Sequence, residues 1–222
     1  MISFNPEDPY PLLDETEAVS LNARQHARST DEWLGLQVLG CEEAIRAEFR
    51  PSHQEIWAQT DPQVFLTPYL EFRLILSLLD PLPTSSIVDL GAAYCRLAFV
   101  MQRHYPEVNF VGIECVERRV LEAQRLFALH GLTRAQVLCA DLTQSSFEIP
   151  IAEHYFVYDF GSRQDIAGLL ERLREIQRRG KQFKLVARGL RTRECVEDLH
   201  RAWLFKEGPI YRESEFAIYS TV

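Results

Sequence analysis

From residue 86 onward, short runs of β-branched and apolar residues alternate with segments of helical periodicity, and this alternation constrains the fold more than any other feature. Strands separated by helices cannot pair as tight hairpins, so they assemble into a parallel sheet with helices on its faces. We therefore predict an α/β fold built on a doubly wound sheet. The expected elements, in order, are Ile87–Leu90, Arg96–Arg103, Phe110–Ile113, Glu117–His130, Gln136–Cys139, His154–Tyr158, a helix opened by Ser162 and closed by Gly180, and Phe183–Val186.

The end of the chain breaks this pattern. Two extended runs, Trp203–Ile210 and Glu215–Thr221, are separated by only a few residues. A connection this short joins antiparallel strands. Together with the parallel strands, this terminal antiparallel β-hairpin predicts a seven-stranded, Rossmann-like sheet. We assign it to a domain of residues 65–222, preceded by an N-terminal helical extension, or lid, of residues 1–64.

The segment before the sheet also shows helical periodicity. Ser29 and Glu32 have the spacing of a capping box, and apolar residues at helical spacing follow them, which predicts one helix over residues 30–50. Residues 1–28 show no clear periodicity and predict an irregular or partly helical arm. A further helix is expected over residues 70–79, where apolar residues recur at helical spacing, and the sequence Asp80-Pro81 ends it.

The composition excludes several classes of protein. Of the 222 residues, 25% are charged and 46% are hydrophobic, which is typical of a globular chain and not of a disordered one. The formal net charge of -8 repels a nucleic-acid backbone, so nucleic acid is not expected as the substrate. No stretch is apolar enough to predict a membrane span, and the N-terminus lacks the pattern of a leader peptide, which favours a cytoplasmic protein.

The cysteines and histidines do not indicate a metal site. The five cysteines are scattered, odd in number and never arranged as Cys-x-x-Cys, and the six histidines show no His-x-x-x-His spacing. We expect reduced thiols and no metal dependence. Basic residues within 172–181 are interleaved with Glu171 and Glu175, so we interpret them as a solvated helix face.

Acidic residues stand where the predicted strands end. Asp89 ends the first strand and Glu114 the second, while Asp141 and Asp159 follow the third and fourth. The carboxyl ends of parallel strands share one edge of a sheet, so these side chains are expected to converge on one crevice. Glu114 follows Gly91 by 23 positions, the offset of an acid that binds a ribose diol. Four carboxylates favour a ligand with hydroxyl and amino groups over a bare phosphate.

The run from about Phe65 to Ala187 resembles the class I S-adenosylmethionine (SAM) dependent methyltransferases, and the terminal hairpin is similar to their antiparallel sixth and seventh strands. Thr67, Pro68 and Tyr69 are similar to a segment of bacterial members related to Dot1-type protein lysine methyltransferases. The resemblance implies that this segment closes over SAM and that Glu114 binds both ribose hydroxyls. The implied cofactor-binding residues are Pro68, Tyr69, Asp89 at the methionine end, Gly91, Ala93, Glu114, and Asp141 and Leu142 at the adenine.

The resemblance also implies a place for methyl transfer. Tyr158, Asp159 and Phe160 are the implied catalytic residues, because they follow the fourth strand and would line the mouth where the methyl group is transferred. The two prolines that follow this position in enzymes that methylate nucleic-acid amino groups are absent here, which favours a protein side chain or a small molecule as the acceptor. Four aromatic residues could form a collar around an acceptor amine: Tyr69, Tyr94, Tyr158 and Phe160. Alternatively, these residues could belong to the core.

The chain departs from the glycine-rich pattern of the family, Asp-x-Gly-x-Gly-x-Gly, at Ala93 and Cys95. If position 93 requires a positive φ, alanine costs roughly 1 kcal/mol more than glycine there. Three hypotheses therefore stay open: an active methyltransferase, a methyltransferase-like binding module that has lost catalysis, and a dinucleotide-binding oxidoreductase. The third lacks its own Gly-x-Gly-x-x-Gly fingerprint.

Overall fold

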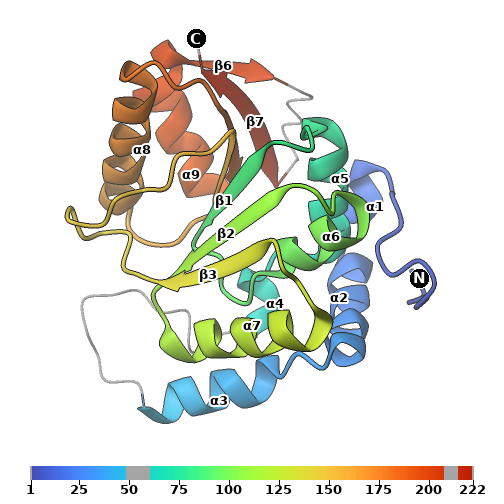
Figure 1. The fold of residues 1–222 in the computed structure, drawn as a ribbon. Coiled ribbons are helices and arrows are strands. Elements are labelled where there is room, and N and C mark those ends of the chain that lie inside the picture. Colours follow the sequence, from blue (N-terminus) through green and yellow to red (C-terminus); the bar gives the residue numbers. More distant parts are fainter. Residues whose placement is uncertain (1, 49–60, 208–214, 222) are drawn as a thin grey trace.

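The structure of the protein, a computed structural model, describes residues 2–48, 61–207 and 215–221. Its centre is a seven-stranded sheet in the order β3-β2-β1-β4-β5-β7-β6 (Figure 1). Strand β7 pairs antiparallel with both of its neighbours, and the other pairings are parallel, which confirms the predicted sheet and its terminal hairpin. The strands are β1 (Ser86–Leu90), β2 (Asn109–Glu114), β3 (Ala135–Cys139), β4 (His154–Val157), β5 (Lys184–Arg188), β6 (Leu204–Glu207) and β7 (Phe216–Thr221).

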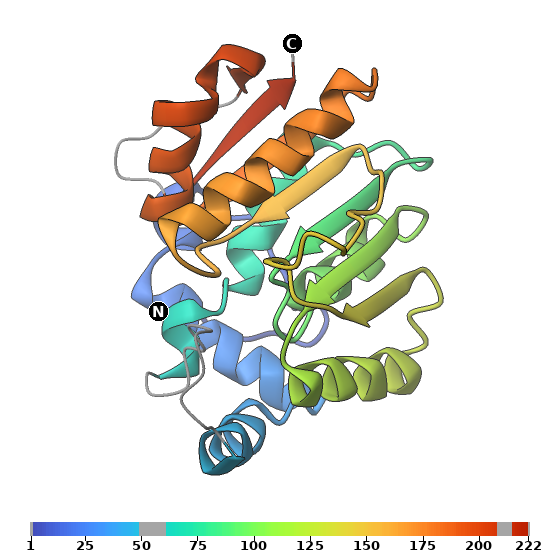
Figure 2. The same cartoon turned by 90° about the vertical axis from the view of Figure 1, so that its left-hand side faces the viewer.

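Helices cover both faces of the sheet (Figure 2). Helices α5 (Tyr69–Leu79), α6 (Arg96–His104) and α7 (Glu117–His130) pack on one face, and α8 (Arg163–Arg178) and α9 (Leu190–Cys195) pack on the other. A π-helical turn η1 (Val196–His200) and a 3-10 turn η2 (Arg201–Trp203) connect α9 to β6. Residues 208–210, part of the first predicted hairpin run, lie outside the described residues.

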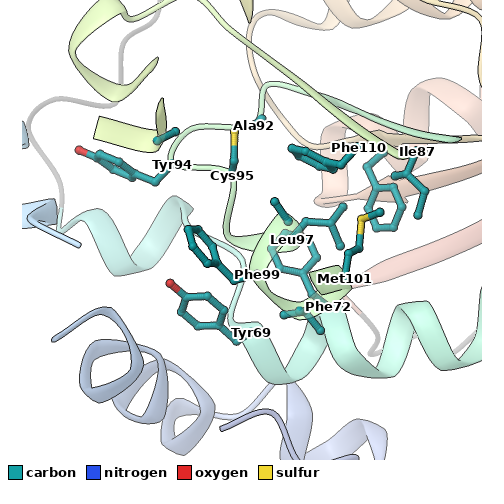
Figure 3. Close-up of a cluster of buried hydrophobic side chains, with 14 of the residues drawn as sticks. Tyr69, Phe72, Ile87, Ala92, Tyr94, Cys95, Leu97, Phe99, Met101 and Phe110 are labelled. Carbon is teal, nitrogen blue, oxygen red and sulfur yellow. The ribbon is translucent and has the colours of Figure 1, made fainter. Parts of the chain in front are cut away.

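Alternate side chains of each strand enter different cores. Along β1, Ile87 belongs to the core beneath α5 and α6, and Val88 belongs to the core beneath α8. This period of two follows from strand geometry. Figure 3 shows the first core, in which Phe72 of α5 lies with Leu97 and Met101 of α6. Because helices cover both faces, a ligand reaches the sheet at the carboxyl ends of its strands.

The predicted single helix over residues 30–50 is wrong. The chain forms two helices there, α2 (Leu21–Leu34) and α3 (Val38–Glu48). Gly35, at φ 72°, ends α2 in the left-handed conformation that glycine adopts without steric cost. Residues 49 and 50 lie outside the described residues.

The start of that helix also differs from the expectation. Ser20 caps α2 by accepting the Ala23 N–H at 3.3 Å, whereas Ser29 lies inside the helix. The arm of residues 1–28 is therefore partly helical, and it also contains α1 (Glu15–Ala18). The capping of the later helices agrees with the sequence, because Gly131 ends α7 and Ser162 opens α8.

The N-terminal helices pack on the rest of the protein. Leu34, Leu36 and Val38 belong to the same core as the residues of α5 and α6. Helix α4 (Pro62–Phe65) then leads into α5. These contacts fix the N-terminal segment against the helices α5 and α7, and the division of the chain at residue 65 stays a prediction.

Candidate functional site

The turn between β1 and α6 is left-handed at alternate residues. Gly91, Ala93 and Cys95 have φ angles of 94°, 46° and 56°. The backbone N–H groups of Gly91 and Ala92 both donate to the Ile113 carbonyl at 2.9 Å, which ties the turn to β2. A side chain in the left-handed region costs about 1–2 kcal/mol. Ala93 and Cys95, the two positions at which this chain lacks the glycine of the pattern, therefore do adopt a positive φ.

Gly112 of β2 provides the space that Cys95 occupies. A Cβ at position 112 would lie 2.6 Å from Cys95 Sγ and 3.0 Å from Ala92 Cβ. A distance of 2.6 Å is shorter than packed side chains adopt, so a side chain at position 112 would force Cys95 to shift. Because Gly112 has no side chain, β2 leaves room for the side chain of Cys95 in the turn.

A cavity of about 710 Å³, which we call the outer cavity, opens at the carboxyl ends of β1, β2, β3 and β4. This volume is in the range of small-molecule sites. Gly91, Glu114, Asp141 and Asp159 all line it, together with Phe160. The structure thus brings together strand-end residues that are up to 68 positions apart in the chain.

Glu114, the last residue of β2, is 5% exposed, and the backbone holds its carboxylate in place. Oε2 accepts the Ala93 N–H at 2.9 Å, and Oε1 accepts the Val116 N–H at 2.9 Å. Oε1 also accepts the Cys115 thiol, with Sγ at 3.6 Å. Arg119 Nη1, the nearest cationic atom among the described residues, lies 3.8 Å from Oε1, beyond hydrogen-bond distance. Each carboxylate oxygen accepts about two hydrogen bonds. Glu114 therefore retains acceptor capacity toward the outer cavity.

The loop after β3 carries Asp141 and Leu142. Asp141 Oδ1 accepts from the Thr143 N–H at 2.9 Å and from its hydroxyl at 2.7 Å, which fixes the loop as a local turn. Arg172 of α8 donates to the Leu142 carbonyl at 2.8 Å and to the Phe147 carbonyl. Arg172 is thus not part of a solvated face, because it anchors one wall of the outer cavity.

Asp159 is bonded to the start of α9. Its Oδ1 accepts from the Thr192 N–H at 2.7 Å and from the Thr192 hydroxyl at 2.8 Å, and its Oδ2 accepts the Arg191 N–H at 3.3 Å. A Cβ at Gly189 would lie 2.5 Å from this carboxylate. The geometry therefore gives Asp159 the role of a cap for α9, and its catalytic role stays a prediction.

A smaller space of about 40 Å³, which we call the inner compartment, lies between α5 and the sheet. Phe65, Gly91, Ala93 and Tyr158 line both spaces, so the inner compartment adjoins the outer cavity at these residues. It is much smaller than the outer cavity. The site is therefore a large cavity with a small extension beneath the turn.

Two charged groups in the inner compartment, Asp89 and Arg188, have hydrogen-bonding capacity that no described residue uses. Asp89 is 8% exposed and has no hydrogen bond to any described residue. Its burial, and to a smaller extent the charge of Glu114, raise its pKa from 3.8 to about 7. Arg188, at the end of β5, donates from Nε and Nη2 to Glu71 at 2.7 and 2.9 Å and lies over the Tyr158 ring at 4.2 Å. Its buried Nη1 has no acceptor among the described residues.

Several solved structures share this architecture. The C-terminal domain of precorrin-6Y C5,15-methyltransferase from Rhodobacter capsulatus aligns with a TM-score of 0.53 and 19% identity, over 72% of this chain and 91% of that one. The TehB-like SAM-dependent methyltransferase from Corynebacterium glutamicum aligns with a TM-score of 0.52 and 14% identity, over 68% and 88%. The chain has the class I SAM-dependent methyltransferase fold. An O-methyltransferase from neocarzinostatin biosynthesis, NcsB1, solved in complex with S-adenosyl-L-homocysteine (SAH), aligns at 0.50 and 19%, over 67% of this chain and 52% of that one.

No protein-family model and no curated protein matches the sequence. At identities of 14–19%, the solved structures establish the methyltransferase fold and not the reaction. What the site of this methyltransferase-fold protein can do must therefore be argued from its own residues.

Two of the predicted cofactor-binding residues lie away from both spaces. The Tyr69 hydroxyl donates to Asp31 Oδ1 at 2.7 Å, and its ring stacks on Tyr10. Pro68 precedes α5 as its N-cap residue, and neither residue is among the described residues that line the outer cavity or the inner compartment. Thr67, directly before them, does line the inner compartment.

Of the aromatic residues considered for a collar, Tyr158 and Phe160 line the outer cavity. A Cβ at Gly91 would lie 3.3 Å from Phe160 Cβ, so Phe160 contacts the turn and narrows the approach without closing the cavity. Tyr94 is buried, and its hydroxyl donates to Glu42 at 2.7 Å. The sequence analysis missed Arg188, which ends a strand just as the four acids do and could have been found by the same signal.

The described residues contain no group of three His, Cys, Asp or Glu side chains placed to hold a metal ion. The helices described in the structure include none with the length and apolarity needed to cross a membrane. The cysteines are free thiols, and Cys115 lines the outer cavity.

Proposed function

We propose that this protein is a SAM-dependent methyltransferase whose outer cavity binds the adenosine part of the cofactor and whose inner compartment binds its amino-acid part. SAM supplies a methyl group that is activated by its attachment to a sulfonium. We further propose that the acceptor is a protein side chain or a small molecule, because the net charge of -8 opposes binding to nucleic acid. The free cysteines fit a reducing compartment, and we propose the cytoplasm.

The observation that supports this proposal best is the unused hydrogen-bonding capacity of Asp89 and of Arg188 Nη1 in the inner compartment. A buried polar group without a partner costs about 1–3 kcal/mol. Asp89 can accept hydrogen bonds from an ammonium group, and Arg188 Nη1 can donate to a carboxylate, so the two together complement the amino-acid end of SAM. Because β4 lies between β1 and β5, the backbones of these two strands are about 10 Å apart. The long side chain of Arg188 brings its guanidinium closer to Asp89 than the strands themselves are.

The same pair disfavours a dinucleotide. A pyrophosphate held beside the turn would meet the unpaired carboxylate of Asp89, which an anion avoids. An ammonium group, by contrast, is attracted to it. The oxidoreductase hypothesis therefore loses support from the charge of the inner compartment as well as from the sequence.

In the outer cavity, Glu114 is proposed to accept hydrogen bonds from the ribose hydroxyls. The loop of Asp141 and Leu142, which Arg172 anchors, is proposed to contact the adenine. Tyr158 and Phe160, which line the outer cavity, are proposed to exclude water from the place of transfer. Because few obligatory groups are needed for methyl transfer, the contribution of the protein is mainly to orient the two reactants.

Calorimetric titration with SAH, SAM, adenosine and NAD tests this proposal. SAH is expected to bind the wild type, and Glu114→Ala is expected to weaken it at least 100-fold, since two charge-assisted hydrogen bonds are lost at about 1.5–3 kcal/mol each. Arg188→Gln is expected to weaken SAH and to leave adenosine binding unchanged, because adenosine has no amino-acid end. Glu117→Ala, an exposed acid near the site, is the matched control and should bind SAH like the wild type.

The outcomes separate the three hypotheses. Failure of SAH and SAM to bind at millimolar concentration contradicts the proposed function, and selective binding of NAD would support an oxidoreductase. If SAH binds, incubation of the protein with a lysate and SAM labelled in its methyl group distinguishes an active enzyme from a binding module. Label that enters a protein or a small molecule supports activity, and its absence supports the binding module.

A further inference from the structure

Helix α3 reaches the proposed cofactor site through one buried residue, Glu42. Helix α3 lies along α7 (Figure 1). Glu42 is 0% exposed and accepts hydrogen bonds from Arg119 Nε at 2.8 Å, from Arg119 Nη2 at 3.2 Å and from the Tyr94 hydroxyl at 2.7 Å. Arg119 belongs to α7, and Tyr94 belongs to the turn after β1. One carboxylate from the N-terminal segment therefore holds Arg119, which lines the outer cavity, and Tyr94, which lines the inner compartment.

Arg119 stands between two buried carboxylates and is hydrogen-bonded to only one of them. Two of its nitrogen atoms bond to Glu42, whereas its Nη1 stops 3.8 Å from Glu114 Oε1. Its guanidinium also lies over the Phe65 ring, 5.1 Å from the centroid. All three side chains of the ionic cluster are at most 7% exposed, so little water screens the attraction between Arg119 and Glu114.

The position of Arg119 matters because guanidinium and ribose compete for the same atoms. A carboxylate that forms a direct fork with arginine gives both oxygens to it. The Glu114 oxygens already accept two backbone N–H groups and the Cys115 thiol, and the capacity that remains is what a ribose diol would use. A shift of Arg119 by about 1 Å would place it within hydrogen-bond distance and use that capacity.

We propose that Glu42 is a positioning residue that holds Arg119 away from Glu114 and so keeps the Glu114 carboxylate available to the ribose of the cofactor. This inference rests on the proposed function. It makes the N-terminal segment part of the cofactor site, because the charge of Glu42 on α3 decides which acid Arg119 bonds to. Tyr94 adds to the effect, since its hydrogen bond fixes the Glu42 carboxylate from the side of the turn.

The test uses Glu42→Gln, which preserves the shape of the side chain and removes its charge. Arg119 is expected to leave the neutral amide for Glu114, and SAH is expected to bind about tenfold more weakly, which is about 1.4 kcal/mol. In the double variant Glu42→Gln with Arg119→Gln, no guanidinium competes, and SAH affinity is expected to return to within about threefold of the wild type. A purely structural role for Glu42 would not produce this recovery.

Glu122→Gln is the matched control. Glu122 of α7 is 7% exposed, accepts the Gln37 N–H at 2.8 Å and pairs with Arg125, so it also fastens the N-terminal segment to α7. It is not among the described residues that line the outer cavity. Loss of its charge is expected to leave SAH affinity unchanged, which separates the effect of Glu42 on Arg119 from a general loosening of that contact.

Each result decides the inference. Wild-type affinity in Glu42→Gln overturns it, and so does a double variant that binds SAH as weakly as Glu42→Gln. If Glu42→Gln does not fold, the double variant is compared directly with the wild type, and loss of its SAH binding overturns the inference. If the wild type itself binds no SAH, the proposed function fails, and a ligand-free crystal structure of Glu42→Gln decides: Arg119 within about 3.2 Å of Glu114 supports the inference, and an unchanged distance refutes it.

Discussion

Asp89 is expected to reduce the stability of the ligand-free protein at neutral and alkaline pH. Burial and the charge of Glu114 raise its pKa from 3.8 to about 7, so the folded state binds this proton more tightly than the unfolded state. Below pH 3.8, Asp89 is protonated in both states and does not lower the free energy of unfolding. It falls as the pH rises between the two pKa values, and it stays at its lower level above pH 7.

The size of the effect follows from the raised pKa. One pKa unit corresponds to about 1.36 kcal/mol, so the full interval corresponds to roughly 4 kcal/mol as an upper value. Asp89→Asn removes the ionisation and keeps the shape of the side chain. In urea unfolding of both proteins, the stability gained by the substitution is expected to be about 2–3 kcal/mol larger at pH 8 than at pH 5. An equal gain at both pH values, or a larger gain at pH 5, would refute the reasoning.

The same carboxyl group predicts a pH dependence of SAH binding. The ammonium group of SAH is attracted to ionised Asp89, and the ionised fraction of a group with a pKa near 7 rises about tenfold between pH 6 and pH 8. SAH affinity of the wild type is expected to rise by about the same factor, and that of Asp89→Asn is expected to be flat over this range. Calorimetry at the two pH values measures both. A flat wild-type profile would place the ammonium group elsewhere.

Three shorter predictions concern the turn and the loop. Gly112→Ala is expected to destabilise the protein by about 1–3 kcal/mol in urea unfolding, because the new Cβ would lie 2.6 Å from Cys95 Sγ, and Cys95→Gly should recover most of the loss. Ala93→Gly is expected to raise stability by up to about 1 kcal/mol, since φ is 46° there, and a loss of stability would contradict the strain. Arg172→Ala is expected to weaken SAH and adenosine equally, by about tenfold, in calorimetry; an effect on SAH alone would contradict an adenine wall.

The strands and most helices of the α/β part could be predicted because their signals are local. Helix α7 has the predicted bounds, Glu117–His130, since its periodicity ends at a glycine that stops it. The N-terminal helices could not be separated in the same way. The apolar residues Leu34, Val38, Cys41 and Ile45 keep helical spacing across Gly35, so periodicity continues where the backbone turns. Only the left-handed conformation of Gly35 reveals the break.

The places of the strand-end acids could be predicted, but their partners could not. Position at the end of a parallel strand fixes the edge that a side chain reaches, which is why Glu114 and Asp141 line one cavity. The partner of Asp159 is the start of α9, and the partner of Tyr69 is Asp31 on α2. Both partners depend on how helices pack against each other. Helix α9 was not predicted, and Asp31 lay in a predicted helix whose packing against α5 the sequence does not show.

The two missing glycines of the turn need not signal a lost function. The backbone adopts a positive φ at Ala93 and Cys95 despite their side chains, at a cost of about 1–2 kcal/mol each, and a domain with about 5–15 kcal/mol of stability tolerates that strain. The volume that a glycine at position 95 would leave free is supplied by Gly112 on the next strand. The turn thus keeps its shape while the outer cavity beside it stays open at about 710 Å³. A turn that accommodates no ligand could relax to a backbone conformation of lower energy. The turn instead keeps its strained conformation beside a cavity of ligand size, which is expected if ligand binding requires that conformation.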